Sequence, residues 1–506
     1  MAKPHPLPLY QQLAADYGEA IGKGALPAGS RMPSVRELMR RHEVSLSTAL
    51  QTLRLMEERG WLEARPRVGY FVQGAATPAL AELADPDLRT PLAADQSRFG
   101  DRYVGLNERI SLVLDSARRA GVRVDLGGAT PGPGLFDVVA MNRSAAALLR
   151  EHPELLVLGR ATTGAHPEFQ AAMARRALDA GVRLAPQDVL ATSGNTEAVH
   201  LALTAVAQPG DVVAVESPTY YGLLQVIESQ GLKSLEIPCS PRTGISLEAL
   251  ELAVRTEPRL KAVVVMPHLQ MPLGTLMPDS HKAGLVAFCS KHGLALVEDD
   301  SYRLLLDSPA PPRPAKAWDV SGHVIYCESF NKTLAPGLRQ GWMSAGRWHE
   351  RVYMLKFAQS RNTAQWGQLL AARWASAPAF ARHLQRLRTS LRSQREQAAR
   401  AVARHFPAGT RLSIPPGGLN LWVELPPGAS SSVLFDQALR EGIRIAPGSM
   451  FSNTGRYDGF VRLGCTQAFT DEVERAYRTL GSLLRAQQLA SQPGQGNAGD
   501  LVLQKV

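Results

Sequence analysis

The stretch SFNKTLAPGLRQGW, residues 329–342, decides how the rest of the chain is interpreted. It begins where an apolar run, HVIYCES (323–329), ends, so Lys332 follows a strand that we expect to be buried. A lysine in a pocket of low polarity can be held neutral and form an imine. Arg339, seven residues later, can pair with a phosphate through its planar fork of nitrogens. The alternative is a surface lysine whose stem packs on apolar neighbours.

Three more apolar runs precede this stretch, namely DVVAVES (211–217), KAVVVMP (261–267) and LALVEDD (294–300). They alternate with longer amphipathic segments between residues 107 and 487. Such alternation predicts βαβ units, and therefore an α/β domain whose largely parallel sheet is covered by helices on both faces.

Polar motifs follow several of these runs, which is where α/β folds place their ligands. TSGNTEA (192–198) is expected to be a turn that opens a helix, whose free N–H groups and dipole favour an anion, although any capped helix start looks the same. Asp299 and Tyr302 lie at the end of the apolar strand LALVEDD, and a buried carboxylate there needs a partner such as a protonated ring nitrogen. A helix cap or an ion pair is the alternative for Asp299.

Two more side chains complete the set of candidates. Tyr220 can stack on a flat ring, or it can be an ordinary core tyrosine. Arg462 can clamp a carboxylate through its guanidinium, or it can form a surface ion pair. A phosphate seat, a stacking ring, a carboxylate, an imine-forming lysine and a second phosphate ligand are together what a pyridoxal phosphate site requires.

The order of these motifs resembles that of the fold-type I aminotransferases over residues 107–487. The resemblance implies a large mixed-sheet domain with a small C-terminal α+β subdomain. It implies that Lys332 forms the internal aldimine, that Asp299 keeps the ring nitrogen protonated and that Arg462 binds the carboxylate of an amino acid. The other cofactor contacts that it implies are Tyr302 on the ring hydroxyl, Tyr220 on the ring face, and Ser193, Gly194, Asn195, Ser329 and Arg339 on the phosphate.

The first 74 residues have a different organisation. We expect a helix over Leu9 to Gly22, a second helix capped by Ser34, and a third capped by Ser47 and ending at Gly60. Two short helices joined by a tight turn make a helix-turn-helix, and the alternating residues after Gly60 suit a β-wing. The alternative is a helical cap on an enzyme, with charges that only solvate it.

The segments LPAGSRMPSVREL, VSLST and GWLEARPRVGYFV resemble the winged-helix domain of GntR-type regulators, which implies a double-stranded DNA operator as partner. In one departure, Leu46 stands where many members have arginine. The DNA contacts that the resemblance implies are Arg36 on phosphate, Ser45, Ser47, Thr48 and Gln51 in the groove, and Arg65, Arg67 and Gly69 at the wing.

As a whole, the chain resembles the MocR-type transcriptional regulators, in which a GntR-type winged helix is fused to an aminotransferase-like domain. The resemblance implies a homodimer, often head-to-tail, whose DNA affinity is set by pyridoxal phosphate or by an amino compound bound to it as an aldimine. The alternative is an aminotransferase acting on an amino acid and a 2-oxo acid, with slow residual transamination as an intermediate case.

Three departures from the aminotransferase pattern count against efficient transamination. Met271 stands where an asparagine usually hydrogen-bonds the ring hydroxyl, and it cannot do so. Gly159, Arg160 and Ala161 occupy a stretch that usually carries a tyrosine, and Asn331 replaces a common serine. Losing oriented hydrogen bonds typically lowers a rate by orders of magnitude.

Length and composition agree with a chain of several domains. The 506 residues are too many for one core, and the predicted division is 1–74 winged helix, 75–106 linker, 107–487 effector domain and 488–506 flexible tail. Net charge is +10, which suits a polyanionic partner without proving one. The four cysteines lie far apart, so neither a disulfide framework nor a metal site is expected. With no membrane-spanning run and no secretory signal, we expect a cytoplasmic protein.

Overall fold

The computed structural model of the chain describes residues 8–22, 25–27, 29–65, 68–73, 80, 83, 106–157, 164–308 and 310–491. Arg67, the stretch 159–161, most of the predicted linker and the tail from 492 onward lie outside the described residues. The chain divides into two compact units, Met1–Ala79 and Leu80–Val506, and each is described by itself. The domain boundaries given above stay a prediction. Two residues of the predicted linker, Leu80 and Leu83, pack against cores of the second unit.

The first unit is a three-helix domain with a β-hairpin, as the sequence predicts. Its elements are α1 (Leu9–Gly22), α2 (Val35–His42), α3 (Leu46–Glu58), β1 (Leu62–Arg65) and β2 (Gly69–Val72). The two strands pair antiparallel, with Arg65 opposite Gly69. Leu13, Leu38, Leu53 and other apolar side chains from all three helices and both strands fill its core.

Two caps set the starts of α2 and α3. Ser34 accepts a hydrogen bond from the N–H of Glu37, as predicted. The cap of α3, however, is Ser45 and not Ser47, because Ser45 has the extended backbone of a capping residue and accepts from Thr48 N–H at 3.2 Å. The prediction for Ser47 was therefore wrong by two residues, and Ser47 lies inside the first turn.

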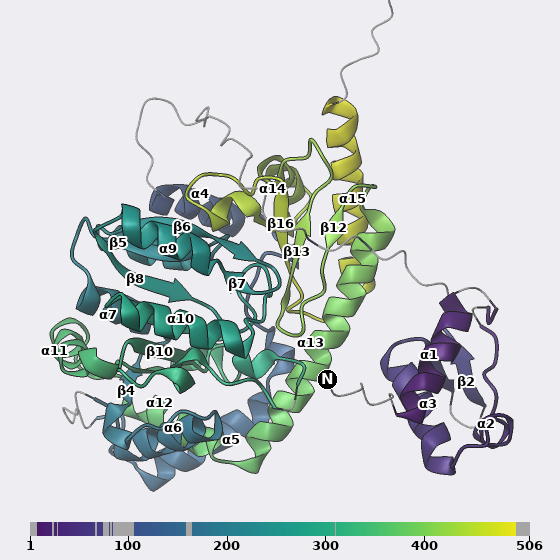
Figure 1. Ribbon diagram of the computed structural model, residues 1–506, viewed down its shortest axis with the longest axis horizontal. Coiled ribbons are helices and arrows are strands. Elements are labelled where there is room, and N and C mark those ends of the chain that lie inside the picture. Colours follow the sequence, from purple (N-terminus) through teal and green to yellow (C-terminus); the bar gives the residue numbers. More distant parts are fainter. Residues whose placement is uncertain are drawn as a thin grey trace, which may run out of the picture. The chain divides into compact units, whose positions relative to one another are not determined.

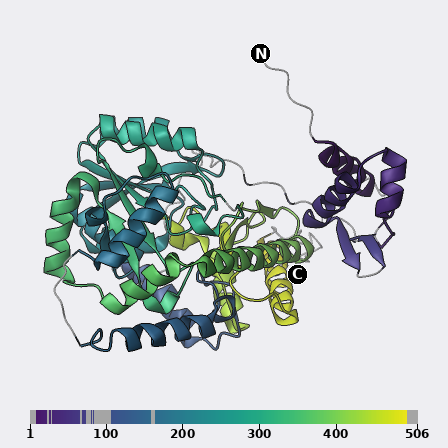
Figure 2. The ribbon, with the colours of Figure 1, turned by 90° about the horizontal axis from the view of Figure 1, so that it is seen from below.

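The second unit has an α/β core and a smaller α+β part (Figures 1 and 2). Its helices are α4 (Leu106–Arg119), α5 (Val138–Glu151), α6 (Pro167–Asp179), α7 (Asn195–Val206), α8 (Tyr221–Ser229), α9 (Leu247–Thr256), α10 (Asp279–Lys291), α11 (His349–Gln359), α12 (Gln365–Ala375), α13 (Pro378–His405), α14 (Ser431–Arg440) and α15 (Asp471–Ser491). Its strands are β3 (Val124–Asp125), β4 (Leu190–Thr192), β5 (Val212–Ser217), β6 (Lys233–Ser240), β7 (Gly244–Ile245), β8 (Leu260–Val265), β9 (Ala295–Asp299), β10 (Val324–Ser329), β11 (Gly341–Ser344), β12 (Arg411–Leu412), β13 (Asn420–Glu424), β14 (Ile443–Arg444), β15 (Ala446–Pro447) and β16 (Phe460–Gly464).

The main sheet has eight strands in the order β4-β11-β10-β9-β8-β5-β6-β7. Neighbours from β10 to β6 run parallel, while β11 is antiparallel to both β10 and β4, and β7 is antiparallel to β6. Alternate residues of the central strands face opposite ways, so that Val213 and Val264 pack under α7 and α8, whereas Val263 and Leu296 pack under α9 and α10. Burial on both faces explains why these strands are apolar throughout.

The small part contains an antiparallel sheet in the order β12-β13-β16-β15 and a short parallel pair, β3 with β14. The pair joins Val124 to Ile443, although these residues are far apart in sequence. The long helix α13 lies beside α15 and against β13, and it runs from the large sheet to the small one (Figure 1). Within the described ranges, no helix is long and apolar enough to cross a membrane.

Candidate functional site

The carboxyl ends of β4, β9 and β10 meet at one edge of the main sheet, and a cavity of about 430 Å³ opens there. Both Asp299 and Ser329 are the last residues of their strands. The cavity is lined by seven of the predicted cofactor residues, Asn195, Tyr220, Asp299, Tyr302, Ser329, Lys332 and Arg339. Ser193 and Gly194, which were also predicted, immediately precede Asn195 but do not line the cavity.

Lys332 lines the cavity, and its amine is held by two hydrogen bonds. Its Nζ donates to the carbonyl of Ala129 at 2.6 Å and to Thr130 Oγ1 at 2.9 Å. Burial and the nearby guanidinium groups of Arg462 and Arg339 together lower the pKa of Lys332 to about 8, while the Asp299 carboxylate opposes them. A fraction of the amine is therefore neutral near pH 7, as an imine-forming lysine requires.

Asp299 is the buried carboxylate of the site. Its Oδ1 accepts from the Ser301 N–H at 3.1 Å. Burial raises the pKa of Asp299, although hydrogen bonds from Ser301 and from the Asn195 side chain favour the charged form. The Asn195 side chain thus hydrogen-bonds to Asp299, and the backbone N–H of Asn195 remains for a phosphate.

The loop before α7 is the predicted anion seat. Gly194 has φ +83° and ψ −179°, a conformation open essentially to glycine alone, and a Cβ there would lie 3.0 Å from Asn331 Nδ2. Because Gly194 has no side chain to cap the helix, the first N–H groups of α7 are left for an anion. Arg339 comes to this loop and donates to the Ser193 carbonyl at 3.2 Å.

Glu197, in the first turn of α7, occupies part of this seat. Its carboxylate accepts the Ser193 N–H, so this amide is already taken and only the hydroxyl of Ser193 is free to bind a phosphate. Lys356, buried on α11, compensates the negative charge with its Nζ 3.3 Å from Glu197 Oε1. The pair joins α11 to the start of α7.

Two tyrosines bound the cavity on its apolar side. Tyr302 is buried and packs in the same cluster as Met266 and Leu305, and Tyr220 packs at its edge beside Tyr221, with ring centroids 4.9 Å apart. Burial raises the pKa of both Tyr220 and Tyr302, so both stay protonated and can donate a hydrogen bond.

Arg462 lies behind the cavity and does not line it. It is 0% exposed, donates to the Gly127 carbonyl, and reaches the Met271 sulfur at 3.9 Å. Its Nε has no partner, and among the described residues no carboxylate pairs with its guanidinium. A buried charge in this state favours an external anion.

Other polar groups of the cavity were missing from the sequence prediction. Asp125 and Arg444 form an ion pair at 3.3 Å on its wall, and Thr130 and Thr466 lie close by. They come from the β3–β14 pair and from the loops beside β3 and β16, which only the tertiary fold brings together. The run VDLGGATPG at 124–132, a strand end followed by a glycine turn, was the one sequence signal for this wall.

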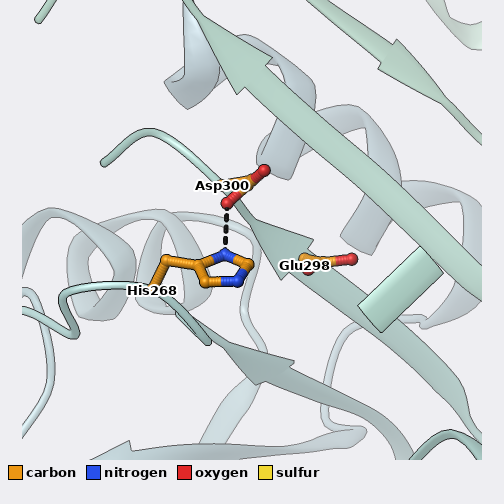
Figure 3. Close-up of side chains that lie close together, drawn as sticks. All are labelled: His268, Glu298 and Asp300. Atoms are coloured by element: carbon orange, nitrogen blue, oxygen red, sulfur yellow. Dashed lines mark hydrogen bonds and ion pairs between the residues drawn. The ribbon is translucent and has the colours of Figure 1, made fainter. Parts of the chain in front are cut away.

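Next to Asp299, the side chains of His268, Glu298 and Asp300 lie close enough together to hold a metal ion (Figure 3). Their atoms are already engaged. Glu298 accepts the N–H groups of Ala315 and Lys316, at 2.6 and 2.8 Å. His268 Nδ1 lies 2.7 Å from Asp300, and its Nε2 lies 3.2 Å from the Lys282 ammonium.

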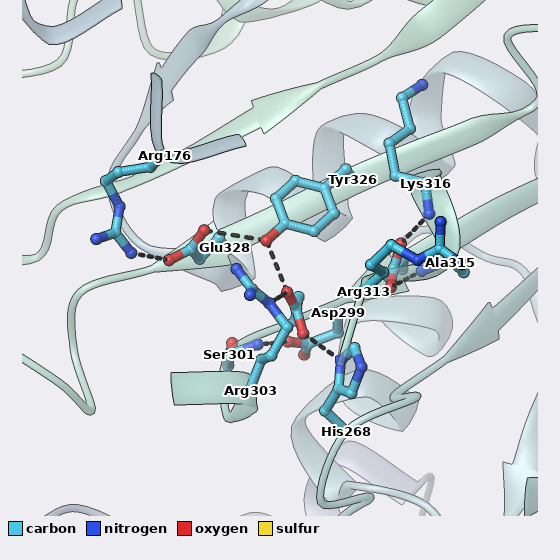
Figure 4. Close-up of polar contacts among 12 residues, drawn as sticks. Arg176, His268, Asp299, Ser301, Arg303, Arg313, Ala315, Lys316, Tyr326 and Glu328 are labelled. Carbon is cyan, nitrogen blue, oxygen red and sulfur yellow. Dashed lines mark hydrogen bonds and ion pairs between the residues drawn. The ribbon is translucent and has the colours of Figure 1, made fainter. Parts of the chain in front are cut away.

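The same carboxylate belongs to a longer buried network (Figure 4). Asp300 Oδ2 accepts from Arg303 at 2.6 Å and from the Tyr326 hydroxyl at 2.7 Å, and Tyr326 reaches Glu328, which pairs with Arg176. Burial by itself would raise the pKa of Asp300, but the Arg303 guanidinium, His268 and the hydrogen bond from Tyr326 lower this pKa to about 2. The cluster is thus a charged scaffold beneath Asp299 with no spare ligand atoms for a cation.

The cavity fits pyridoxal phosphate by three observations. Gly194 leaves room where a Cβ would crowd Asn331, and the helix start has free N–H groups for a phosphate. Asp299 offers a buried carboxylate with a raised pKa, which a protonated ring nitrogen would neutralise. Among the described residues, the buried oxygens Oδ1 of Asn195 and Oδ1 of Asn331 have no partner.

The predicted DNA contacts lie on the first unit. Arg36 is exposed on α2, and Ser47 and Gln51 are exposed on α3. Arg65, at the end of β1, pairs with Glu63 at 3.4 Å and lies over the Phe71 ring. The remaining predicted contacts are Ser45 and Thr48 at the start of α3, Gly69 at the start of β2, and Arg67, which lies outside the described residues.

Comparison with known proteins identifies both parts of the chain. Residues 9–72 match the gntR family of bacterial regulatory proteins, and residues 147–480 match aminotransferase class I and II. The chain is 34% identical over 473 residues to the uncharacterized HTH-type transcriptional regulator YjiR of Escherichia coli, covering 93% of this chain and 98% of that protein. It is 28% identical over 459 residues to the probable rhizopine catabolism regulatory protein MocR of Rhizobium meliloti, covering 87% and 86%.

A solved structure agrees with the fold and the cofactor. The α-aminoadipate aminotransferase LysN of Thermus thermophilus, complexed with N-(5'-phosphopyridoxyl)-L-leucine, superposes with a TM-score of 0.68 at 29% identity, over 75% of this chain and 95% of that one. The fold and the cofactor expected from the sequence are confirmed, and the cofactor is pyridoxal phosphate. The chain belongs to the MocR-type transcriptional regulators, in which a gntR-family helix-turn-helix domain is joined to an aminotransferase-like domain.

Proposed function

We propose that the protein binds an operator in double-stranded DNA through its winged helix, and that an amino compound bound at the pyridoxal phosphate site sets its affinity for that operator. The observation that carries the proposal is the cavity that brings Lys332, Asp299 and Arg339 together in a chain that also has a gntR-type domain. When bound, pyridoxal phosphate supplies an aldehyde that condenses with amines. A ligand that binds one arrangement of the protein better than another shifts the population toward that arrangement.

Each side chain has a proposed task at this site. Lys332 offers an amine to the cofactor and moves when an amino compound displaces it. Asp299 holds a proton on the ring nitrogen. Arg462, behind the cavity, anchors the carboxylate of the amino compound, since its buried charge has no carboxylate partner among the described residues. The other proposed contacts are Arg339, Ser193, Gly194, Asn195 and Ser329 for the phosphate, Tyr302 for the ring hydroxyl and Tyr220 for the ring face.

The regulator is proposed to act as a homodimer in the cytoplasm. A helix-turn-helix dimer reads two half-sites about one helical turn apart or a multiple of it, so a palindromic operator is the expected target. The wing, with Arg65 and Arg67, would add contacts to the DNA backbone, which strengthen binding without selecting a sequence.

The test is a footprint of the cofactor-loaded protein on the DNA upstream of its own gene, at fixed salt, with a panel of amino acids as added amines. We expect a protected site whose occupancy changes with pyridoxal phosphate and with one class of amine. Lys332→Ala should still protect the site without responding to the amine. Protection by the wild type that ignores both cofactor and amines would refute the sensing role.

Aminotransfer is the second candidate function. The pKa of about 8 at Lys332 favours it, because an amine that titrates near neutral pH can take and return a proton. Met271 opposes it, since its sulfur contacts Asn420 and Arg462 in the place of a hydrogen-bonding amide. Mass spectrometry of a 2-oxo acid incubated with amino donors would detect the reaction, and Met271→Asn should raise its rate if the thioether is what limits it.

A further inference from the structure

The exposed tip of helix α3 carries a large aliphatic side chain. Leu46 is the first residue of the helix and is 55% exposed. It is not among the side chains that build the core of the first unit, to which α3 contributes Ala49, Leu53 and Met56. One exposed leucine on a protein surface needs no explanation, but this one stands at the end of the helix that a helix-turn-helix inserts into the major groove.

The polar side chains around Leu46 are turned toward one another. Ser45 Oγ accepts the Thr48 N–H and lies 2.8 Å from Ser47 Oγ and 2.9 Å from Thr48 Oγ1. The three hydroxyls therefore satisfy each other and the helix cap. Leu46 is the exposed apolar side chain of this turn.

Only one feature of a base edge in the major groove suits an aliphatic group. Every base pair offers hydrogen-bond donors or acceptors there, which a leucine cannot use, but thymine also offers its C5 methyl group. We propose that Leu46 is a specificity-determining residue that reads a thymine methyl in each operator half-site. The inference rests on the proposed DNA binding by α3, and it gives that helix a base preference.

The size of the effect follows from the area of one methyl group. Removing a buried methyl or methylene from an apolar contact weakens binding by about fourfold. An arginine at the same position would instead donate two hydrogen bonds to a guanine, so Leu46→Arg should change the preferred base rather than only weaken binding.

The experiment starts by selecting preferred sites from a random duplex library, using the full-length protein loaded with pyridoxal phosphate at fixed salt. Each thymine of the selected site is then replaced singly by deoxyuridine, which lacks only the C5 methyl. We expect one thymine per half-site at which the replacement weakens wild-type binding about fourfold. Leu46→Ala should bind the thymine and deoxyuridine sites equally, and selection with Leu46→Arg should give guanine at that position.

One variant serves as the control. Leu9→Ala removes a leucine that is 52% exposed on α1 of the same unit, and it should keep the full thymine preference. An enriched site with no methyl-dependent thymine, or an unchanged preference in Leu46→Ala, overturns this inference alone. A selection that enriches no site overturns the proposed operator binding together with it.

Discussion

The charge environment of Lys332 can be tested by titrating its reaction with the cofactor. Two guanidinium groups, of Arg462 and Arg339, lower the pKa of the amine, and the Asp299 carboxylate raises it. Arg462→Met should therefore raise the pKa of Lys332 above about 8, because it removes a positive charge while keeping a side chain of similar length. Asp299→Asn should lower that pKa below about 8.

The expected magnitudes follow from the fraction of neutral amine. With a pKa of about 8, roughly one amine in ten is neutral at pH 7, whereas with an ordinary pKa of 10.5 it would be about one in three thousand. The apoprotein should thus combine with added pyridoxal phosphate about ten times faster for each pH unit gained below 8, and the rate should level off above that pH. For Arg462→Met, a rise of half a unit already slows the reaction at pH 7 about threefold.

Stopped-flow absorbance measures this rate as the visible band of the bound cofactor appears. Lys332→Arg should give no band at all. Arg444→Met is the matched control, since Arg444 lines the same cavity but is paired with Asp125, and it should leave the midpoint unchanged. A wild-type midpoint near 10, or midpoints that move in the same direction for Arg462→Met and Asp299→Asn, would refute the reasoning.

Three further predictions concern the phosphate seat, the wing and the helix cap. Gly194→Ala should lower the stability by about 1–3 kcal/mol, because the positive φ of Gly194 is strained for alanine, and this should appear as a lower Tm and as weaker cofactor binding in equilibrium dialysis. Gly337→Ala, where a Cβ would meet open space, should change neither. Replacing Arg65 and Arg67 by alanine should weaken DNA binding for all sequences alike and reduce the salt slope by about one per lost phosphate contact, whereas an unchanged slope would remove the wing from the interface. Ser45→Ala should speed hydrogen exchange of the α3 amides by an amount equivalent to about 1 kcal/mol, since it removes the cap, and unaltered exchange would contradict the assignment of the cap to this residue.

Much of the fold could be predicted because local signals and buried periodicity agree. The helix Leu9–Gly22 and the strands β5, β8, β9 and β10 lie within a residue or two of the predicted segments. Their long apolar runs identify strands buried on both faces. The choice between Ser45 and Ser47 as the cap of α3 could not be made, because both are good caps and the difference depends on which of them has an extended backbone.

The site was predictable where its residues follow strands, and less so where the tertiary fold supplies them. Lys332 follows one apolar run and Asp299 ends another, and the structure brings them to one cavity. Arg444 was missed because it reaches the cavity through a two-residue strand, whose partner β3 lies more than three hundred residues earlier. Glu197 was missed because a glutamate in the first turn of a helix is an ordinary dipole partner, and only the structure shows that it takes an amide of the anion seat.

The pairing of β3 with β14 has a consequence for the order in which the protein is made. Val124 cannot meet Ile443 until the ribosome has translated nearly the whole chain, whereas the core of the first unit is built from residues between Leu13 and Val72. Domains fold as units during synthesis, and at roughly 5–20 residues per second the second unit follows the first by tens of seconds. Each newly made chain therefore acquires its helix-turn-helix before it has a complete cofactor cavity, and for that interval the nascent regulator can fold the part that reads DNA but has nothing with which to sense a ligand.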